Sequence, residues 1–206
     1  MRNPTWLDWA REIQALGQNG LAYSRSEFDR ERYRRLLELS VEIVGAHAKI
    51  SREQWLTGFL SQPGYATPKV DLRGAMVRDN RILLVQERSD GGWSLPGGWA
   101  DVGEYPSQAV VREIREESGY TARVSKVVGI YDANRSGRPL EFFHAYKIVF
   151  LCDITGGEAR SSVETLAVDF FDFDCLPPLS ANRTSEIHLA EIRAHLSDSE
   201  RRTAFE

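Results

Sequence analysis

The chain has 206 residues, of which 42% are hydrophobic and 27% are charged, a composition that excludes disordered, collagenous and fibrous proteins. Its net charge of −4 argues against non-specific binding to nucleic acid, because the phosphate backbone requires a basic surface. No segment approaches the roughly 18 to 20 uninterrupted apolar residues of a membrane span, and the first residues lack the apolar core of a signal peptide, so we expect a cytoplasmic protein. Cys152 and Cys175 are too few for a disulfide framework, and we expect both to be core thiols.

Residues 1–65 predict a small helical domain. Thr5 and Asp8 form a capping-box pattern at the start of a first helix, which we expect to end at Gly17 and Gly20. Arginines between residues 25 and 35 alternate with acidic residues, which indicates a solvated helix face. So small a unit buries too little surface to be stable alone, and we expect it to pack on a partner. Two further helices are expected over residues 29–44 and 51–62.

Residues 66–206 change to the period of a sheet and predict an α+β domain. A turn at Asp79 and Asn80 should join its first two strands. One helix is expected between the early and late strands, and another near the C-terminus. The expected strands span 70–77, 82–85, 122–131, 142–152 and 166–173, and the expected helices span 106–118 and 184–196.

The helix over residues 106–118 carries a concentrated set of charges. Pro106 suits the first helical turn, and Gly119 suits the left-handed position that ends a helix. Within these limits Glu113, Glu116 and Glu117 fall at positions i, i+3 and i+4, so three carboxylates project from one face.

This cluster of like charges is unfavourable by itself, since each such pair costs roughly 0.2–0.5 kcal/mol. Arg112 lies one turn before Glu116 and offsets part of the repulsion. A hard divalent cation with oxygen ligands, Mg²⁺ or Mn²⁺, would stabilise the cluster more completely. The alternative is a solvated, salt-bridged helix face without a metal.

The stretch from Gly97 to Tyr120 resembles the Nudix box, G-x5-E-x7-R-E-U-x-E-E-x-G-U, in which U is a bulky apolar residue. Only the last position departs, since Tyr120 stands where an aliphatic residue is commoner. The resemblance implies the Nudix α/β/α sandwich with a mixed sheet over roughly residues 66–206, preceded by the helical domain. The matched positions are Gly98, Glu104, Arg112, Glu113, Ile114, Glu116, Glu117 and Gly119.

The N-terminal part is similar to the helical region of one Nudix branch. That branch hydrolyses nucleoside diphosphates linked to another moiety, X, and includes CDP-choline pyrophosphatase. The runs that carry this second resemblance are residues 18–24, 28–33 and 67–75.

The Nudix resemblance implies roles for individual residues. Arg112 would orient the glutamates, and Glu104 would have a structural or accessory role, such as a weaker outer ligand of the metal. The general base would be either Glu116 or Glu164, a loop residue just before the last predicted strand; the alternative for Glu164 is an ordinary exposed loop acid. One to three Mg²⁺ or Mn²⁺ ions would be held by Glu113, Glu116, Glu117 and the Gly98 carbonyl.

Substrate contacts must come from outside the box. Aromatic side chains can stack on a nucleobase, and a histidine can contact a phosphate. Each candidate has a structural alternative, since aromatics on strands commonly belong to the core. The candidates are Trp93, Tyr131, Phe143 and His144.

The leading hypothesis is a Mg²⁺-dependent hydrolase that cleaves a nucleoside diphosphate linked to X, such as CDP-choline or ADP-ribose, to a nucleoside monophosphate and phospho-X. A second enzymatic possibility is sanitisation of nucleoside triphosphates, which releases pyrophosphate. A third is a sensor that binds such molecules without cleaving them, which the intact glutamate set disfavours. The helical domain suggests a homodimer through its large apolar residues Trp6, Trp9, Trp55 and Phe59.

Overall fold

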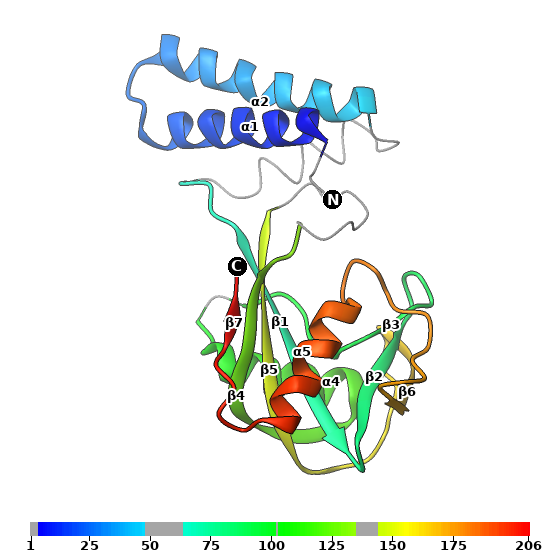
Figure 1. Cartoon of the computed structure of the whole chain (residues 1–206). Coiled ribbons are helices and arrows are strands. Elements are labelled where there is room, and N and C mark those ends of the chain that lie inside the picture. Colours follow the sequence, from blue (N-terminus) through cyan, green and yellow to red (C-terminus); the bar gives the residue numbers. More distant parts are fainter. Residues whose placement is uncertain (1–3, 48–63, 102, 135–143) are drawn as a thin grey trace. The chain divides into compact units, whose positions relative to one another are not determined.

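The computed structural model describes residues 4–47, 64–101, 103–134 and 144–206 (Figure 1). Internal contacts divide the chain into two units. The helical unit comprises the described residues up to Pro68 together with Asn134 and His144. The sheet unit comprises residues 69–133 and 145–206.

Two antiparallel helices, α1 (Thr5–Tyr23) and α2 (Glu27–His47), lie side by side in the helical unit (Figure 1). The predicted capping box at Thr5 is wrong, because Pro4 is the N-cap and no side chain caps the helix. The predicted helix over residues 51–62 lies outside the described residues. The shared core of the two helices consists of Leu7, Ala10, Val41 and Val44.

The prediction that α1 ends at Gly17 and Gly20 is also wrong. Both glycines lie inside the helix, where they face α2. A Cβ atom at Gly17 would lie 3.0 Å from the side chain of Leu37, and one at Gly20 would overlap the ring of Tyr33. Packing between the helices therefore overrides the low helix propensity of glycine, since only glycine allows this close approach.

The solvated face predicted for α2 is confirmed. Arginines pair with acidic residues along the same helix, as in Arg32 with Asp29 at 2.7 Å and Arg35 with Glu42 at 2.8 Å. These side chains are about half exposed or more, so each ion pair contributes little stability.

The sheet unit is a mixed seven-stranded sheet among the described residues, which confirms the predicted α+β class. The strand order is β3-β2-β1-β5-β4-β7, and β6 pairs with β2. β1 is parallel to β5, and β2 is antiparallel to β1 and β6. The two-residue strands β3 and β7 were not predicted, since so short a run shows no period. The strands are β1 (Lys69–Arg78), β2 (Arg81–Glu87), β3 (Trp93–Ser94), β4 (Tyr120–Asp132), β5 (Ala145–Gly157), β6 (Thr165–Asp172) and β7 (Ala204–Phe205).

Two helices cover the sheet, α4 (Pro106–Ser118) and α5 (Glu186–Ser197), and each packs on its own apolar cluster. Figure 1 shows α5, in orange-red, in front of the sheet and α4, in green, behind it. Val110 and Ile114 of α4 are fully buried over β1. A side chain at Gly74 of β1 would overlap Ile114, so this glycine lets α4 lie close to the sheet. The position of α4 is therefore set by packing.

The predicted turn at Asp79 and Asn80 is confirmed. Both residues have positive φ angles, 52° and 58°, as in the two-residue turns that match the twist of a hairpin. Cys152 is buried as predicted, but Cys175 is exposed, so the prediction of a second core thiol is wrong. None of the helices in the described parts of the chain is long and apolar enough to cross a membrane.

Candidate active site

α4 is held at both ends by the residues that the sequence indicated. Pro106 occupies its first turn, and Gly119 follows its last residue with a φ angle of 79°. The Gly119 amide donates to the carbonyl of Arg115, which closes the last turn. These two ends and the buried apolar face leave Arg112 and Glu116 on the outer surface of α4, with Glu113 more buried beside them.

Arg112 is the centre of the polar cluster. Its Nε and Nη2 atoms donate to the carboxylate of Glu104 at 2.9–3.2 Å, and its Nη1 donates to Glu113 at 2.7 Å and to Glu116 at 3.1 Å. Hydrogen bonding to Glu104 is the largest cause of a raised pKa of Arg112, and it lowers the pKa of Glu104. The guanidinium therefore stays charged and ties the loop that carries Glu104 to α4.

The carboxylates of α4 differ in burial. Glu116 is 59% exposed, Glu113 is 16% exposed, and Glu117 is 4% exposed. Burial raises the pKa of Glu113, and it raises the pKa of Glu117 to about 7. Arg73 is the strongest influence in the opposite direction on Glu117. The carboxylates of Glu113 and Glu117 are thus neighbours that are both shielded from water, an arrangement that a cation would stabilise.

The two glycines at the start of the box lie between β1 and α4. The carbonyls of Pro96 and Gly98 both accept from amides of β1, so the Gly97 peptide between them is turned toward α4. Its amide donates to Oε2 of Glu117 at 2.8 Å. Gly97 has a φ angle of 140°, and any side chain there would overlap the carbonyl oxygen of Leu72. Only glycine fits this position.

Glu164 lies in the loop before β6, and this loop is tied to α4. The hydroxyl of Thr165 donates to the backbone carbonyl of Glu117 at 2.9 Å. Arg88 holds the other side of the loop through its amide, which donates to the Glu164 carbonyl, and through Nε, which donates to the Val163 carbonyl. The charge of Glu164 contributes to the raised pKa of Glu113. The structure thus brings this loop acid toward the α4 carboxylates.

The donor set suits a hard divalent cation, because it consists of carboxylate and backbone carbonyl oxygens. In the described part of the chain, no three acidic, histidine or cysteine side chains already converge on one ion-binding point. Arg112 instead lies between Glu113 and Glu116. The carbonyl of Gly98 points to the Leu72 amide at 2.8 Å, so its predicted role as a ligand is less favoured than one for the neighbouring Gly97 peptide.

The aromatic candidates do not gather around α4. Trp93 packs edge-on against Phe171 and belongs to the cluster beneath α5. Tyr131 is buried in the same cluster, and its ring centroid lies 4.7 Å from that of His188. Phe143 lies outside the described residues. His144 is exposed and groups with the helical unit, so its contact with substrate stays a prediction.

The sequence reasoning missed a row of buried charges beneath the site. Asp71 and Arg73 of β1 and Lys147 of β5 are all nearly inaccessible to solvent. The sequence contained a signal for these charges, because charged residues alternate with apolar ones in this strand. When such a strand is buried, its charged residues must be paired. Trp99 was missed as well; it lies beside Gly98 with half of its surface exposed, and the Nζ of Lys69 is 5.8 Å from its ring.

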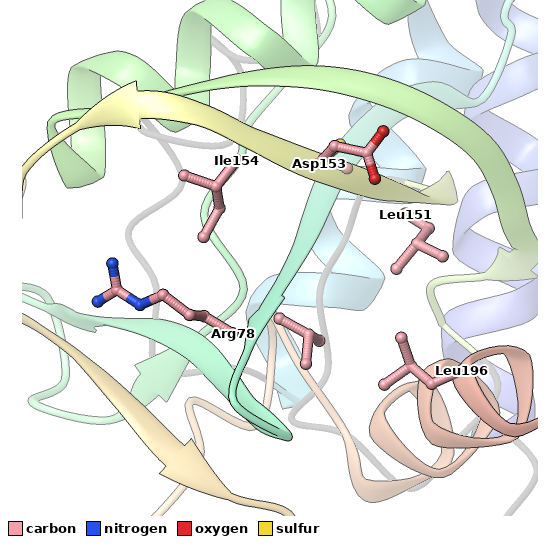
Figure 2. A pocket seen from close by; sticks show the side chains of 7 residues that line it. Arg78, Leu151, Asp153, Ile154 and Leu196 are labelled. Atoms are coloured by element: carbon pink, nitrogen blue, oxygen red, sulfur yellow. The ribbon is translucent and has the colours of Figure 1, made fainter.

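A separate pocket of about 420 Å³ lies at the end of β1 that is remote from Lys69 (Figure 2). It includes none of the predicted site residues, so we do not assign the chemistry to it. Its lining residues are Val77, Arg78, Leu151, Cys152, Asp153, Ile154 and Leu196.

Two known families match this chain. Residues 4–59 match the family described as "UDP-X-like, N-terminal oligomerisation domain". Residues 69–190 match the family described as "NUDIX domain", which is more than half of the chain.

Individual relatives are similar over different lengths. The Bacillus subtilis protein YjhB, whose name gives it provisionally as an ADP-ribose pyrophosphatase, is 39% identical over 201 residues, which cover 98% of this chain and 97% of the relative. A solved ADP-ribose pyrophosphatase from Streptococcus suis has 40% identity and a TM-score of 0.60, covering 68% of this chain and all of its own. A solved UDP-X diphosphatase has 29% identity and a TM-score of 0.64, covering all of both chains.

Proposed function

The chain belongs to the Nudix family and is a hydrolase of phosphoric anhydride bonds, and from this premise we propose that it cleaves the diphosphate bridge of a nucleoside diphosphate linked to a sugar. ADP-ribose is the first candidate, and the products would be a nucleoside monophosphate and a sugar phosphate. The observation that carries this proposal is the set of carboxylates on α4, held in place by Arg112 and by the glycine loop, Gly97–Gly98, which follows β3 and bonds to β1. These residues match the chemistry that a diphosphate bridge demands.

We infer that the carboxylates hold Mg²⁺ or Mn²⁺. Glu113, Glu116 and Glu117 would supply side-chain oxygens, and the peptide of Gly97 or Gly98 would supply a backbone oxygen. When bound, the cation would neutralise the phosphoryl oxygens and lower the pKa of a water molecule. Arg112 would meanwhile keep Glu113 and the Glu104 loop in place, since its bonds to Glu104 do not depend on the metal site.

Two carboxylates can accept the proton of the attacking water. Glu116 is exposed and accepts a hydrogen bond from Arg112. Glu164 lies in the loop that Thr165 ties to α4. The acidic limb of the pH–rate profile distinguishes them, because only loss of the base removes that limb. Because Glu116→Gln is expected to abolish turnover, the profile is recorded for Glu164→Gln. Its acidic limb persists if Glu116 is the base and disappears if Glu164 is.

The sugar-nucleotide class is supported by similarity over the whole chain. The Bacillus subtilis relative is matched over 97% of its length, and the solved UDP-X diphosphatase over all of its length, so both matches extend through the helical unit. The names of these two proteins differ in the nucleobase, so the base remains open and CDP-choline stays in the candidate set. Triphosphate sanitisation is the second enzymatic possibility, and a sensor that binds without turnover is the third.

One assay tests this assignment. The purified protein is incubated with Mg²⁺ and, separately, with ADP-ribose, UDP-sugars, CDP-choline, dinucleoside polyphosphates and nucleoside triphosphates, and the products are resolved by chromatography. Release of a nucleoside monophosphate is expected, with loss of turnover in Glu116→Gln and retention in Glu158→Gln, which changes an exposed acid in the loop after β5. Pyrophosphate release from triphosphates would contradict the proposal, and binding without turnover would favour a sensor.

We also propose that residues 1–65 form a dimerisation domain and residues 66–206 the catalytic domain. Trp9, Leu16 and Tyr23 recur every seven residues on α1, so they share one face, and each is more than half exposed. A continuous apolar stripe of this kind marks an interaction surface. The matching family is described as an oligomerisation domain, which supports a homodimer through this stripe. Trp6 is instead stacked on His47 inside the unit, and Trp55 and Phe59 lie outside the described residues.

A further inference from the structure

Another buried carboxylate lies outside the Nudix box. Glu87 ends β2 and is only 2% exposed. Its Oε1 atom accepts a hydrogen bond from the hydroxyl of Ser94 at 2.5 Å and lies 3.4 Å from Nε of Arg183. A buried carboxylate must be paired, since burying an unpaired charge is costly. Arg183 is therefore held at Nε by a side chain that the proposed function does not use.

The strand that carries Glu87 is linked to the carboxylate helix. The register of β2 and β6 places Glu87 opposite Thr165. The hydroxyl of Thr165 donates to the backbone carbonyl of Glu117 at 2.9 Å. Glu87, the anchor of Arg183, is therefore connected to α4 through a single residue of β6.

The loop between β6 and α5, which carries Arg183, lies along β3 (Figure 1). It is also joined to the glycine loop. The Leu95 amide donates to Oγ1 of Thr184 at 2.9 Å, and two residues later the Gly97 amide donates to the carboxylate of Glu117 at 2.8 Å. The short segment from Leu95 to Gly97 therefore connects the Arg183 loop to α4.

The guanidinium of Arg183 is anchored but accessible. The amides of Arg183 and Thr184 both donate to the carbonyl of Ser180 at 3.0 Å, which fixes the backbone, and the Arg183 side chain is 34% exposed. Within the described ranges of the chain, no residue accepts a hydrogen bond from its Nη1 or Nη2 atom. The donors of a planar guanidinium form a fork that matches two oxygens of a phosphate group. An anchored fork also loses less freedom when it binds.

A diphosphate needs positive charge beside the carboxylates of α4. Ionised carboxylates repel phosphoryl oxygens, and the chain as a whole carries a net charge of −4. The guanidinium of Arg112 is already occupied, since it donates to Glu104, Glu113 and Glu116. A divalent cation offsets part of the negative charge. The accessible donors of Arg183 can offset a further part.

We propose that Arg183 binds the substrate: its Nη1 and Nη2 atoms donate to oxygens of the diphosphate, while Glu87 holds Nε and sets the plane of the guanidinium. The inference rests on the proposed function in one respect, that the ligand is a nucleoside diphosphate linked to a sugar. Arg183 then sets the affinity for the phosphate groups whatever the nucleobase. The competing role is purely structural, in which Arg183 only neutralises Glu87.

The first test measures binding without turnover. Inorganic pyrophosphate, ADP, UDP and CDP are each titrated into the protein in EDTA and followed by calorimetry, so that neither metal nor catalysis contributes. Arg183→Lys should weaken binding roughly 10–100-fold, because an ammonium that stays beside Glu87 cannot also form the fork. A wild type that binds none of these probes, or an Arg183→Lys variant that binds them equally well, would overturn the proposal.

The matched control is Arg193→Lys. Arg193 lies on α5, and both of its terminal nitrogens donate to the exposed carboxylate of Asp174. The same chemical change at this position should leave the affinity for every probe unchanged. An equal loss in Arg193→Lys would show that the effect of Arg183→Lys is not local, and would count against the proposal.

The second test separates substrate binding from the structural role. The double variant Glu87→Gln/Arg183→Met removes both charges together, so no buried charge is left unpaired, and the glutamine can still accept from Ser94. We expect this variant to lose at least as much affinity as Arg183→Lys. Binding equal to that of the wild type would show that Arg183 only neutralises Glu87. If the double variant does not fold, Arg183→Lys decides the question, since it keeps a charge beside Glu87.

These measurements separate the inference from the proposed function. A wild type that binds the probes but cleaves no nucleotide with Mg²⁺ would refute the proposed reaction, and the loss in Arg183→Lys would still establish the phosphate contact. A wild type that cleaves nucleotides, with an Arg183→Lys variant of unchanged KM and unchanged probe affinity, would keep the reaction and overturn the inference. If both are right, Arg183→Lys raises KM and changes kcat little, as loss of a uniform binding interaction does.

Discussion

Replacing Glu117 by glutamine should stabilise the metal-free protein at pH 8. Glu117 is 4% exposed, and burial raises its pKa from an ordinary value of 4.5 to about 7. Each unit of difference between the folded and unfolded pKa corresponds to about 1.4 kcal/mol. The ionised carboxylate therefore costs the folded state about 3 kcal/mol, which the neutral amide avoids while its oxygen can still accept from Gly97.

The sign of the pH dependence follows from proton binding. Because the folded pKa is the higher one, the unfolded state loses its proton first as the pH rises from 4.5 to about 7. The contribution of Glu117 to stability is thus complete below pH 4.5, declines through this window and is constant above it. The advantage of Glu117→Gln should grow through the same window.

The assay is urea unfolding in EDTA at several pH values between 4.5 and 8. Glu158→Gln serves as the control, since it makes the same chemical change at an exposed site and should show no such window. Added Mg²⁺ should then stabilise the wild type and not the Glu117→Gln variant, because a ligand that binds only the folded state stabilises it. A Glu117→Gln variant that is less stable than the wild type at pH 8, or a difference independent of pH, would refute the reasoning.

Three further predictions concern packing, the glycine loop and assembly. Gly20→Ala should lower the unfolding midpoint, because the added methyl overlaps a tyrosine ring of α2. Gly45→Ala should instead stabilise α2 by about 0.5–1 kcal/mol, because there the methyl meets nothing within 4 Å. Equal effects of the two changes would refute the close-packing role of Gly20. Gly97→Ala should destabilise the protein by at least about 1–3 kcal/mol, because a φ of 140° and a nearby backbone oxygen both exclude a side chain. It should also weaken Mn²⁺ binding; unfolding measures the first effect and titration the second. Wild-type behaviour in both would show that the loop can shift. The double change Trp9→Ser/Leu16→Ser should convert a dimer to a monomer in sedimentation at micromolar concentration without loss of helix content, and an unchanged dimer would place the interface elsewhere.

Much of the candidate site was predictable because it is local. The spacing of Glu113, Glu116 and Glu117 fixes their common face once the segment is helical, and Pro106 and Gly119 mark where the helix begins and ends. The alternation of apolar residues likewise predicted the main strands and the turn at Asp79. In each case the physical cause acts within a few residues, so it is visible in the sequence alone.

The sequence by itself therefore determined the fold class and the carboxylate helix, whereas the tertiary structure decided which residues surround them. Gly20 reads as a helix end until α2 is seen against it, because a close approach between helices is a property of two segments. Tyr131 reads as a substrate contact until its ring is found in the core beneath α5. Arg73 reads as an ordinary strand residue until folding is seen to bury it, where its guanidinium bonds to Asp71 and to the carbonyl of Leu95. A charged side chain that is buried must be paired, because burying an unpaired charge is costly. Which residues form the pairs depends on distances in the folded protein, and the spacing of residues along the chain does not specify these distances.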